Sequence, residues 1–176
     1  DNEVCKELVK DSQARKVRLG ADSCSIHLDE GGVVWPRGGF FLEECLVKGG
    51  HQMRNMAVAV AVARELGIDD DLIEKGLTGF KGLSMRLENK GEHEDIAFYN
   101  DSYATRPEAS LAAVEAFEKS NLAIILGGSD KGADYGELAG ELANREQGTF
   151  VALMEDTQFA IQESLELAGY RGDINI

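Results

Sequence analysis

Short apolar runs alternate with helical segments through the second half of the chain, and this alternation constrains the fold most. Three runs predict strands, and each is followed by a segment that predicts a helix. The strands are expected at 96–100, 122–126 and 149–154, and the helices at 107–119, about 135–144 and about 157–168. Strands that alternate with helices are typical of a parallel sheet with crossover helices. The sequence therefore predicts an α/β fold.

The first part of the chain has a different pattern. Residues 1–48 are expected to be rich in strands, with one strand near 16–20 and a short helix before it. The Asp-Glu-Gly-Gly sequence at 29–32 lies between two apolar runs and predicts a hairpin turn.

Within residues 51–66, the segment 56–63 alternates alanine with larger apolar side chains, and a period of two is also what a strand would show. Both alternating sets are apolar, so the period marks no polar face, and the composition favours a buried helix. A second helix is expected from Asp70 to about Leu77, with Asp69 as its cap. A glycine-containing segment at 79–82 is the best candidate for a boundary between two units.

A polar loop joins the apolar run at 96–99, expected to be a buried strand, to the helix that begins near 107. In open α/β sheets, ligands bind at the carboxyl ends of strands in such loops. Pro107 suits a first helical turn, and Thr105 with Glu108 fits a capping box. Asp101 lies in this loop, where a carboxylate can bind ribose hydroxyls or orient an arginine. The structural alternative is an Asx turn that ends the strand.

Composition limits the classes of partner. The 176 residues carry a net charge of −14, which argues against binding to nucleic acid and to anionic membranes. An anionic ligand must then be met by local cations, and Arg86 and Lys131 are the candidates. Three widely spaced cysteines form no CxxC pattern, which argues against a disulfide framework and against a zinc site. The protein is therefore expected in a reducing cytoplasm. No apolar run is long enough to span a membrane.

Four segments in this order resemble signatures of the Mur ligases, ATP-dependent enzymes that add amino acids to the peptidoglycan precursor. They are 50–55 (GHQMRN), 80–88 (FKGLSMRLE), 100–110 (NDSYATRPEAS) and 126–132 (LGGSDKG). The similarity runs from about residue 15 to about residue 170. It is greatest to the members that join D-glutamate to UDP-N-acetylmuramoyl-L-alanine through an acyl phosphate. The resemblance implies a bacterial cytoplasmic enzyme, a monomer that needs ATP and Mg²⁺.

The resemblance also implies how the chain is organised. Residues 1–81 would be the carboxyl-terminal part of the ATP-binding central domain, and 82–176 an incomplete, Rossmann-like, amino-acid-binding carboxyl-terminal domain. No GxxxxGK[ST] phosphate loop occurs in the sequence. The resemblance assigns that loop, the Mg²⁺ ligands and a carbamylated lysine to a region before the equivalent of Asp1. The chain is therefore expected to be a fragment with no catalytic or metal-binding residue of its own, inactive when alone.

The resemblance assigns three residues to ATP. Asn55 matches an asparagine that reads the adenine edge, for which an amide supplies both a donor and an acceptor. Arg86 and Asp101 would contact the nucleotide together, since a planar guanidinium suits bidentate phosphate recognition. The structural alternative for Arg86 is a surface salt bridge to Glu88 or Glu92, which would contribute little.

The amino-acid site implied by the resemblance comprises Lys131, Thr105, Ser102 and Tyr103. Lys131 would pair with a carboxylate of D-glutamate, and its structural alternative is a solvated loop lysine. Three other positions bear on substrate identity, because Met85 replaces the usual histidine, Tyr103 the usual lysine and Arg106 the usual asparagine. Two further hypotheses remain open: a divergent non-catalytic binding module, and a ligase of the same superfamily with another amino-acid, folate or polyamide substrate.

Overall fold

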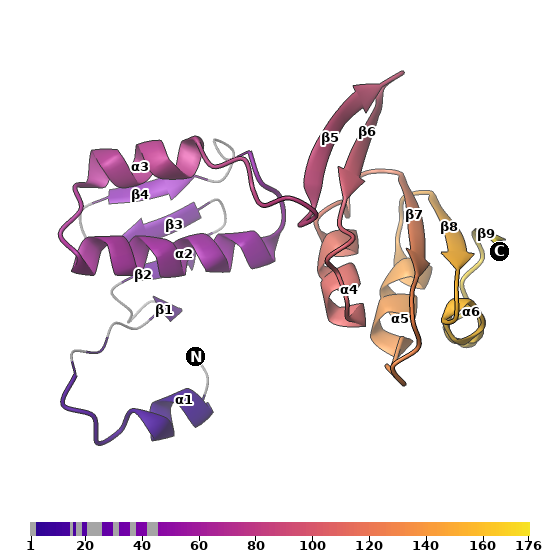
Figure 1. Ribbon diagram of the computed structural model, residues 1–176, viewed down its shortest axis with the longest axis horizontal. Helices are drawn as coiled ribbons and strands as arrows, with labels where there is room; N and C mark the ends of the chain where they lie inside the picture. Colours follow the sequence, from indigo (N-terminus) through magenta and orange to yellow (C-terminus); the bar gives the residue numbers. More distant parts are fainter. Residues whose placement is uncertain are drawn as a thin grey trace. The chain divides into compact units, whose positions relative to one another are not determined.

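The computed structural model describes residues 3–14, 16, 19–20, 26–29, 32–35, 38–41 and 46–176. The chain divides into two compact units, Asp1–Lys81 and Gly82–Ile176. Figure 1 shows the elements of each unit in the colours of the sequence. Each unit has its own apolar core, so each is described separately below.

The first unit contains a four-stranded sheet in the order β1-β2-β3-β4. Its elements are α1 (Glu3–Leu8), β1 (Leu19–Gly20), β2 (Ile26–Asp29), β3 (Gly32–Trp35), β4 (Gly38–Phe41), α2 (Gly50–Glu65) and α3 (Asp70–Thr78). The predicted hairpin is confirmed, because β2 and β3 pair antiparallel with Asp29 opposite Gly32. Turn residues 30–31 lie outside the described part of the chain. The strand β4, which the sequence analysis did not predict, pairs antiparallel with β3.

The helix α2 confirms the prediction of a helix for the alanine-rich segment, but only one of its faces is buried, since Val58 and Val62 are exposed. Its buried residues are Met56, Ala57, Val60 and Ala61, a spacing that places them on one face of a helix. They pack against Ile26, Val33, Trp35 and Phe40 of the sheet and Ile73 and Leu77 of α3. Asp69 precedes α3 at the N-cap position, as predicted, although its carboxylate accepts no capping hydrogen bond.

A polar cluster fastens the two helices to the sheet in this unit. The indole Nε1 of Trp35 donates a hydrogen bond to Asp70 Oδ2 at 3.2 Å, and Arg64 pairs with the other oxygen of Asp70. The Arg64 guanidinium also lies over the Trp35 ring, 5.3 Å from its centroid. Asp70 therefore joins the first turn of α3 to the end of α2 and to β3.

The second unit confirms the predicted α/β fold with a parallel sheet. Strands β7 (Leu122–Gly127), β8 (Thr149–Met154) and β9 (Asp173–Asn175) pair parallel in that order. Helices α4 (Pro107–Glu115), α5 (Gly136–Asn144) and α6 (Gln158–Leu167) lie side by side in a row (Figure 1). The core residues of this unit are Val114, Leu126, Leu138, Ala139, Leu142, Val151, Leu153, Ile161 and Leu165.

Side chains on β7 and β8 alternate between the two faces of the sheet. Leu126, Val151 and Leu153 point toward the helices and are buried. Ile125 and Phe150 lie on the opposite face, where Ile125 is 72% exposed. In the second unit the helices therefore cover one face of the sheet.

The strand at 96–100 differs from the expectation. Strand β6 (Ile96–Asn100) forms, but it pairs antiparallel with β5 (Glu88–His93) in a separate two-stranded hairpin. The prediction of a buried strand is wrong, because Ile96 and Phe98 are exposed. Glu94 and Asp95 connect the strands with positive φ angles of 49° and 63°, as a tight hairpin turn requires. Neither is the glycine that usually marks such a turn, and the polar sequence of β5 gave no strand signal.

The core of the second unit can be tested at α6. Leu165 is fully buried, so Leu165→Ala should lower the free energy of unfolding by about 2–5 kcal/mol, because it leaves a cavity. Leu167 lies on the same helix but is 84% exposed, so Leu167→Ala should change the free energy of unfolding by less than about 0.5 kcal/mol. Urea unfolding followed by far-ultraviolet circular dichroism measures both. Equal effects of the two substitutions would contradict the assigned core.

Candidate functional site

Two loops of the second unit meet at the open end of the hairpin. One precedes β5 and contains Arg86, and the other follows β6 and contains Asp101. They meet because Glu88, at the start of β5, pairs with Asn100, at the end of β6. The hairpin thus brings together two polar segments, although both strands and their turn separate these segments in the sequence.

Two hydrogen bonds connect the loops directly. The Leu87 N–H donates to Asp101 Oδ1 at 2.8 Å, and the Tyr103 N–H donates to the Met85 carbonyl at 3.1 Å. Asp101 is half-buried, so its bond is shielded from water more than an exposed one. Asp101 therefore fixes the backbone immediately beside Arg86.

The backbone around Arg86 is strained. Met85 and Leu87, its two neighbours, have φ angles of 59° and 47°, in the left-handed region. Each such residue costs about 1–2 kcal/mol, and strain of this kind persists only where contacts fix the conformation. Here the Glu88 carboxylate accepts hydrogen bonds from the Met85 N–H at 3.0 Å and from Ser84 Oγ at 3.2 Å. Together with the Asp101 bond, these contacts hold Arg86 at the tip of a tight bend.

The Arg86 side chain contacts Tyr103. Its Nη1 donates to the Tyr103 carbonyl at 3.0 Å, and its Cζ lies 5.0 Å from the centroid of the Tyr103 ring. Within residues 46–176, Arg86 makes no ion pair with Glu88 or Glu92. The Glu88 carboxylate pairs instead with Lys90, at 3.1 Å. The alternative of a surface salt bridge for Arg86 is therefore not observed.

Glu88 is a residue of this site that the sequence analysis did not assign a role. The Met85 N–H and then Lys90 hold the pKa of its carboxyl below the usual value of 4.5. The sequence signal that could have indicated this role is the position of Glu88 in the segment 80–88, two residues after Arg86. The role of Glu88 in the structure is to keep the bend at residues 84–87 in place.

The start of the loop after β6 is an Asx turn, made by Asn100 and not by Asp101. The Asn100 Oδ1 accepts hydrogen bonds from both the backbone N–H and the hydroxyl of Ser102. The Asp101 carboxylate is left to bond Leu87. Ser102, predicted for the amino-acid site, is exposed on this turn.

The predicted capping box between Thr105 and Glu108 is wrong. Pro107 is the first residue of α4, as predicted, but the N-cap is Arg106 and no side chain caps the helix. Thr105 lies one residue before the N-cap and Glu108 is the second residue of the helix, so neither occupies the position that a capping box requires. The Glu108 carboxylate instead pairs with Arg106 at 3.0 Å, and its own backbone N–H and Arg106 lower its pKa. The Thr105 hydroxyl is thus exposed and not engaged in a cap.

Lys131 lies in the loop that follows β7. Glycines dictate the start of this loop, because a Cβ on Gly127 would lie 2.2 Å from the Met154 carbonyl oxygen. Gly128 and Gly132 have φ angles of 144° and 65°. The Asp130 carboxylate accepts a hydrogen bond from the Gly132 N–H at 2.8 Å. The Lys131 ammonium is exposed and makes no contact of its own with other described residues.

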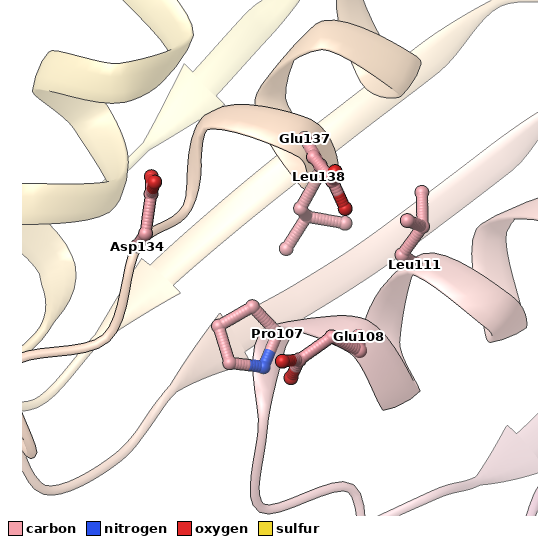
Figure 2. Close-up of a pocket in the computed structure, with 6 residues that line it drawn as sticks. All are labelled: Pro107, Glu108, Leu111, Asp134, Glu137 and Leu138. Atoms are coloured by element: carbon pink, nitrogen blue, oxygen red, sulfur yellow. The ribbon is translucent and has the colours of Figure 1, made fainter. Parts of the chain in front are cut away.

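A small pocket lies between the first turns of α4 and α5. Figure 2 shows Pro107, Glu108 and Leu111 from α4 facing Glu137 and Leu138 from α5, with Asp134 beside them. Its volume of about 230 Å³ is below the roughly 300–1,000 Å³ of most small-molecule sites. It is lined by three carboxylates and no cation, so it is unsuited to an anionic ligand. None of the predicted site residues lines it.

Asn55, the predicted adenine-binding residue, belongs to the first unit. It lies on the exposed side of α2, and its amide Nδ2 is 3.5 Å from Gln52 Oε1. A contact at that distance is weak, so both functions of the amide remain accessible. No group of three or more His, Cys, Asp or Glu side chains suited to a metal ion is found in the part of the chain that the structure describes.

Comparison with known proteins identifies the family. A family model described as "Mur ligase, glutamate ligase domain" matches residues 85–173, which contain the Arg86 bend, the Asp101 loop and the Lys131 loop. The chain belongs to the Mur ligase family. No helix among the described residues of this Mur ligase chain is both long and apolar enough to cross a membrane.

Two curated relatives carry the same name. The chain is 40% identical over 119 residues to UDP-N-acetylmuramoylalanine–D-glutamate ligase of Desulfitobacterium hafniense. The matched segment covers 66% of this chain and 25% of that protein. It is 39% identical over 101 residues to the protein of that name from Streptococcus pyogenes, covering 57% of this chain and 22% of that protein. The chain thus spans about a quarter of the length of the curated relatives it matches.

Solved Mur ligase structures share the fold of this chain. MurF of Acinetobacter baumannii superimposes with a TM-score of 0.69 at 20% identity, over 89% of this chain and 37% of that one. UDP-N-acetylmuramate-alanine ligase MurC of Thermotoga maritima superimposes with a TM-score of 0.65 at 20% identity. The superposition covers 90% of this chain and 39% of that one. Both comparisons support the α/β fold expected for a chain of this family.

The lowered pKa of Glu88 gives a test of the bend. Folding lowers this pKa, so the ionised carboxylate stabilises the folded state above pH 4.5, and this stabilisation is lost as the pH falls through the lowered value. A ¹³C NMR titration of the Glu88 carboxyl should therefore show a midpoint below 4.5. Lys90→Gln should move the midpoint only part of the way back, because the Met85 N–H remains. A midpoint at or above 4.5 in the unsubstituted protein would refute the contacts assigned to Glu88.

Proposed function

We propose that this chain is part of a ligase that uses ATP to join D-glutamate to UDP-N-acetylmuramoyl-L-alanine in bacterial peptidoglycan synthesis. The observation that carries the proposal is the Arg86 bend, a strained segment held by Asp101 and Glu88 beside two exposed loops. The names of the relatives at about 40% identity support the choice of D-glutamate. In this proposal the enzyme works as a monomer in the cytoplasm.

The proposal gives the two units different roles. Residues 1–81 form the last part of the ATP-binding domain, and residues 82–176 form most of the domain that binds the amino acid. The division of the chain after Lys81 is compatible with this assignment. The phosphate loop and the Mg²⁺ ligands would belong to other parts of the enzyme.

Arg86, Asp101 and Asn55 are proposed to bind the nucleotide. Arg86 uses one N–H on the Tyr103 carbonyl, which leaves its other donors for phosphate oxygens. Asp101 uses Oδ1 on the Leu87 N–H, so its second oxygen can accept a ribose hydroxyl. The Asn55 amide can donate to and accept from the adenine edge.

Lys131, Thr105 and Ser102 are proposed to bind D-glutamate, with Tyr103 on the same loop. The Lys131 ammonium is exposed and has no carboxylate partner among the described residues, so it can neutralise a substrate carboxylate. The Thr105 and Ser102 hydroxyls lie before the first turn of α4, where the helix dipole favours an anion. These groups orient the amine of D-glutamate.

ATP supplies the phosphoryl group that activates the L-alanine carboxylate for attack by that amine. The residues of this chain would act by binding and orientation, which can account for much of the rate acceleration of a two-substrate reaction. Arg86 would hold the nucleotide, and Lys131 would hold the acceptor.

The amino-acid site can be tested in the full-length protein that contains this chain. Lys131→Ala should raise the KM for D-glutamate by about ten- to a hundredfold, the scale of one lost charge-assisted contact, with a much smaller effect on the KM for ATP. Lys119→Ala is the matched control, because Lys119 is also exposed and its one ion pair with a described residue is with Glu118, at 3.9 Å. Arg86→Ala and Asp101→Ala should act mainly on the KM for ATP. Equal effects of Lys131→Ala on both constants would remove Lys131 from the amino-acid site.

Because the phosphate loop is assigned to another part of the enzyme, we expect the 176-residue chain to be inactive alone. The sequence has no phosphate loop, so a phosphate-release assay with ATP, UDP-N-acetylmuramoyl-L-alanine and D-glutamate should show no turnover. Release that depends on both acceptor substrates would contradict the assignment of the phosphate chemistry to other parts of the enzyme.

A further inference from the structure

We propose that the Tyr103 side chain is a positioning residue for Arg86, and that it acts on nucleotide binding and not in the amino-acid site. This inference rests on the proposed function, because it requires Arg86 to meet the nucleotide. It changes the role that the resemblance gave to position 103.

Among the described residues, Tyr103 supplies both the hydrogen bond and the ring contact of the Arg86 side chain. The guanidinium donates to the Tyr103 carbonyl and lies over the Tyr103 ring. The nearby carboxylates are engaged elsewhere, since Glu88 pairs with Lys90 and Asp101 bonds the Leu87 N–H. The ring is therefore the one side chain seen to hold the guanidinium in place.

An aromatic partner suits an arginine that must bind phosphate. A carboxylate would neutralise the guanidinium and use its N–H edge, whereas a ring attracts the cation through its face and leaves the charge in place. This matters in a chain with a net charge of −14, where anionic ligands depend on local cations. Arg86 keeps its charge and most of its donors while its motion is restricted.

The loop backbone does not depend on the Tyr103 side chain. The Tyr103 N–H bonds the Met85 carbonyl, and the Ala104 N–H bonds the Asp101 carbonyl at 2.8 Å. Tyr103 is 55% exposed and belongs to neither apolar core. A substitution at this position should thus change the restraint on Arg86 and leave the bend intact.

The position has a different chemistry in this chain from that implied by the resemblance. A lysine at 103 would bring a second cation to the loop, which could pair with a substrate carboxylate but would repel Arg86. Tyrosine removes that cation and supplies a surface for Arg86 instead. Lys131 then remains the cation of the amino-acid site, and position 103 serves the nucleotide.

The test measures ATP and D-glutamate binding separately in the full-length protein. An exposed cation–ring contact is small, so Tyr103→Leu should raise the Kd for ATP by about two- to fivefold. Tyr103→Phe keeps the ring and should restore the unsubstituted affinity, and neither change should alter the Kd for D-glutamate measured with the nucleotide site saturated. Phe98→Leu is the matched control, because Phe98 is a ring of similar exposure, 51%, on β6. It should leave the Kd for ATP unchanged.

A double-mutant cycle decides whether Tyr103 acts through Arg86. In the Arg86→Ala background, Tyr103→Leu should have no further effect on the Kd for ATP. An equal effect in both backgrounds, or a larger effect on D-glutamate than on ATP, would overturn the proposal. A protein that binds ATP with this pattern yet does not ligate D-glutamate would support the positioning role and refute the proposed reaction. A protein that does not bind ATP would refute both.

Discussion

The hydrogen bond from the Leu87 N–H to the Asp101 carboxylate is the interaction on which the candidate site depends. It joins the segment before β5 to the segment after β6, and it holds the backbone in a conformation that Leu87 would not adopt by itself. The hairpin brings the two segments near each other, but the pairing ends at Glu88 and Asn100. Beyond that point, Asp101 and Glu88 together determine where Arg86 is presented.

The charge distribution explains why such a bend is useful. With 32 acidic and 18 basic residues, the chain as a whole repels anions. Two basic side chains near the site are paired with carboxylates, Lys90 with Glu88 and Arg106 with Glu108. Arg86 and Lys131 are exceptions among the described residues: one lies over a ring and the other is exposed in a glycine-rich loop. These two side chains give the loops around the site two cations that no carboxylate of the described residues neutralises.

The sequence predicted the elements whose signals are local. The helix α2 and the strand β8 follow from composition and apolar runs, and the order of strands and helices predicted the parallel sheet. The burial of β6 was predicted wrongly, because burial depends on the partner strand, and the polar sequence of β5 gave no signal. The capping box failed because Pro107 shifts the helix start by one residue. For the site, the motifs indicated Arg86 and Asp101, but the left-handed bend and the contact with Tyr103 depend on three-dimensional geometry that no pattern of residue types encodes.

A crystal structure of the full-length protein with an ATP analogue and D-glutamate would show whether Arg86 binds the nucleotide. The quantity to measure is the distance from the Arg86 guanidinium nitrogens to the phosphate oxygens. We expect hydrogen-bond distances of about 2.7–3.2 Å, with the Leu87 N–H still bonded to Asp101 and Arg86 still over the Tyr103 ring. A bound nucleotide that leaves Arg86 in solvent, or an Arg86 that binds the D-glutamate carboxylate, would contradict the proposed role of Arg86 in nucleotide binding.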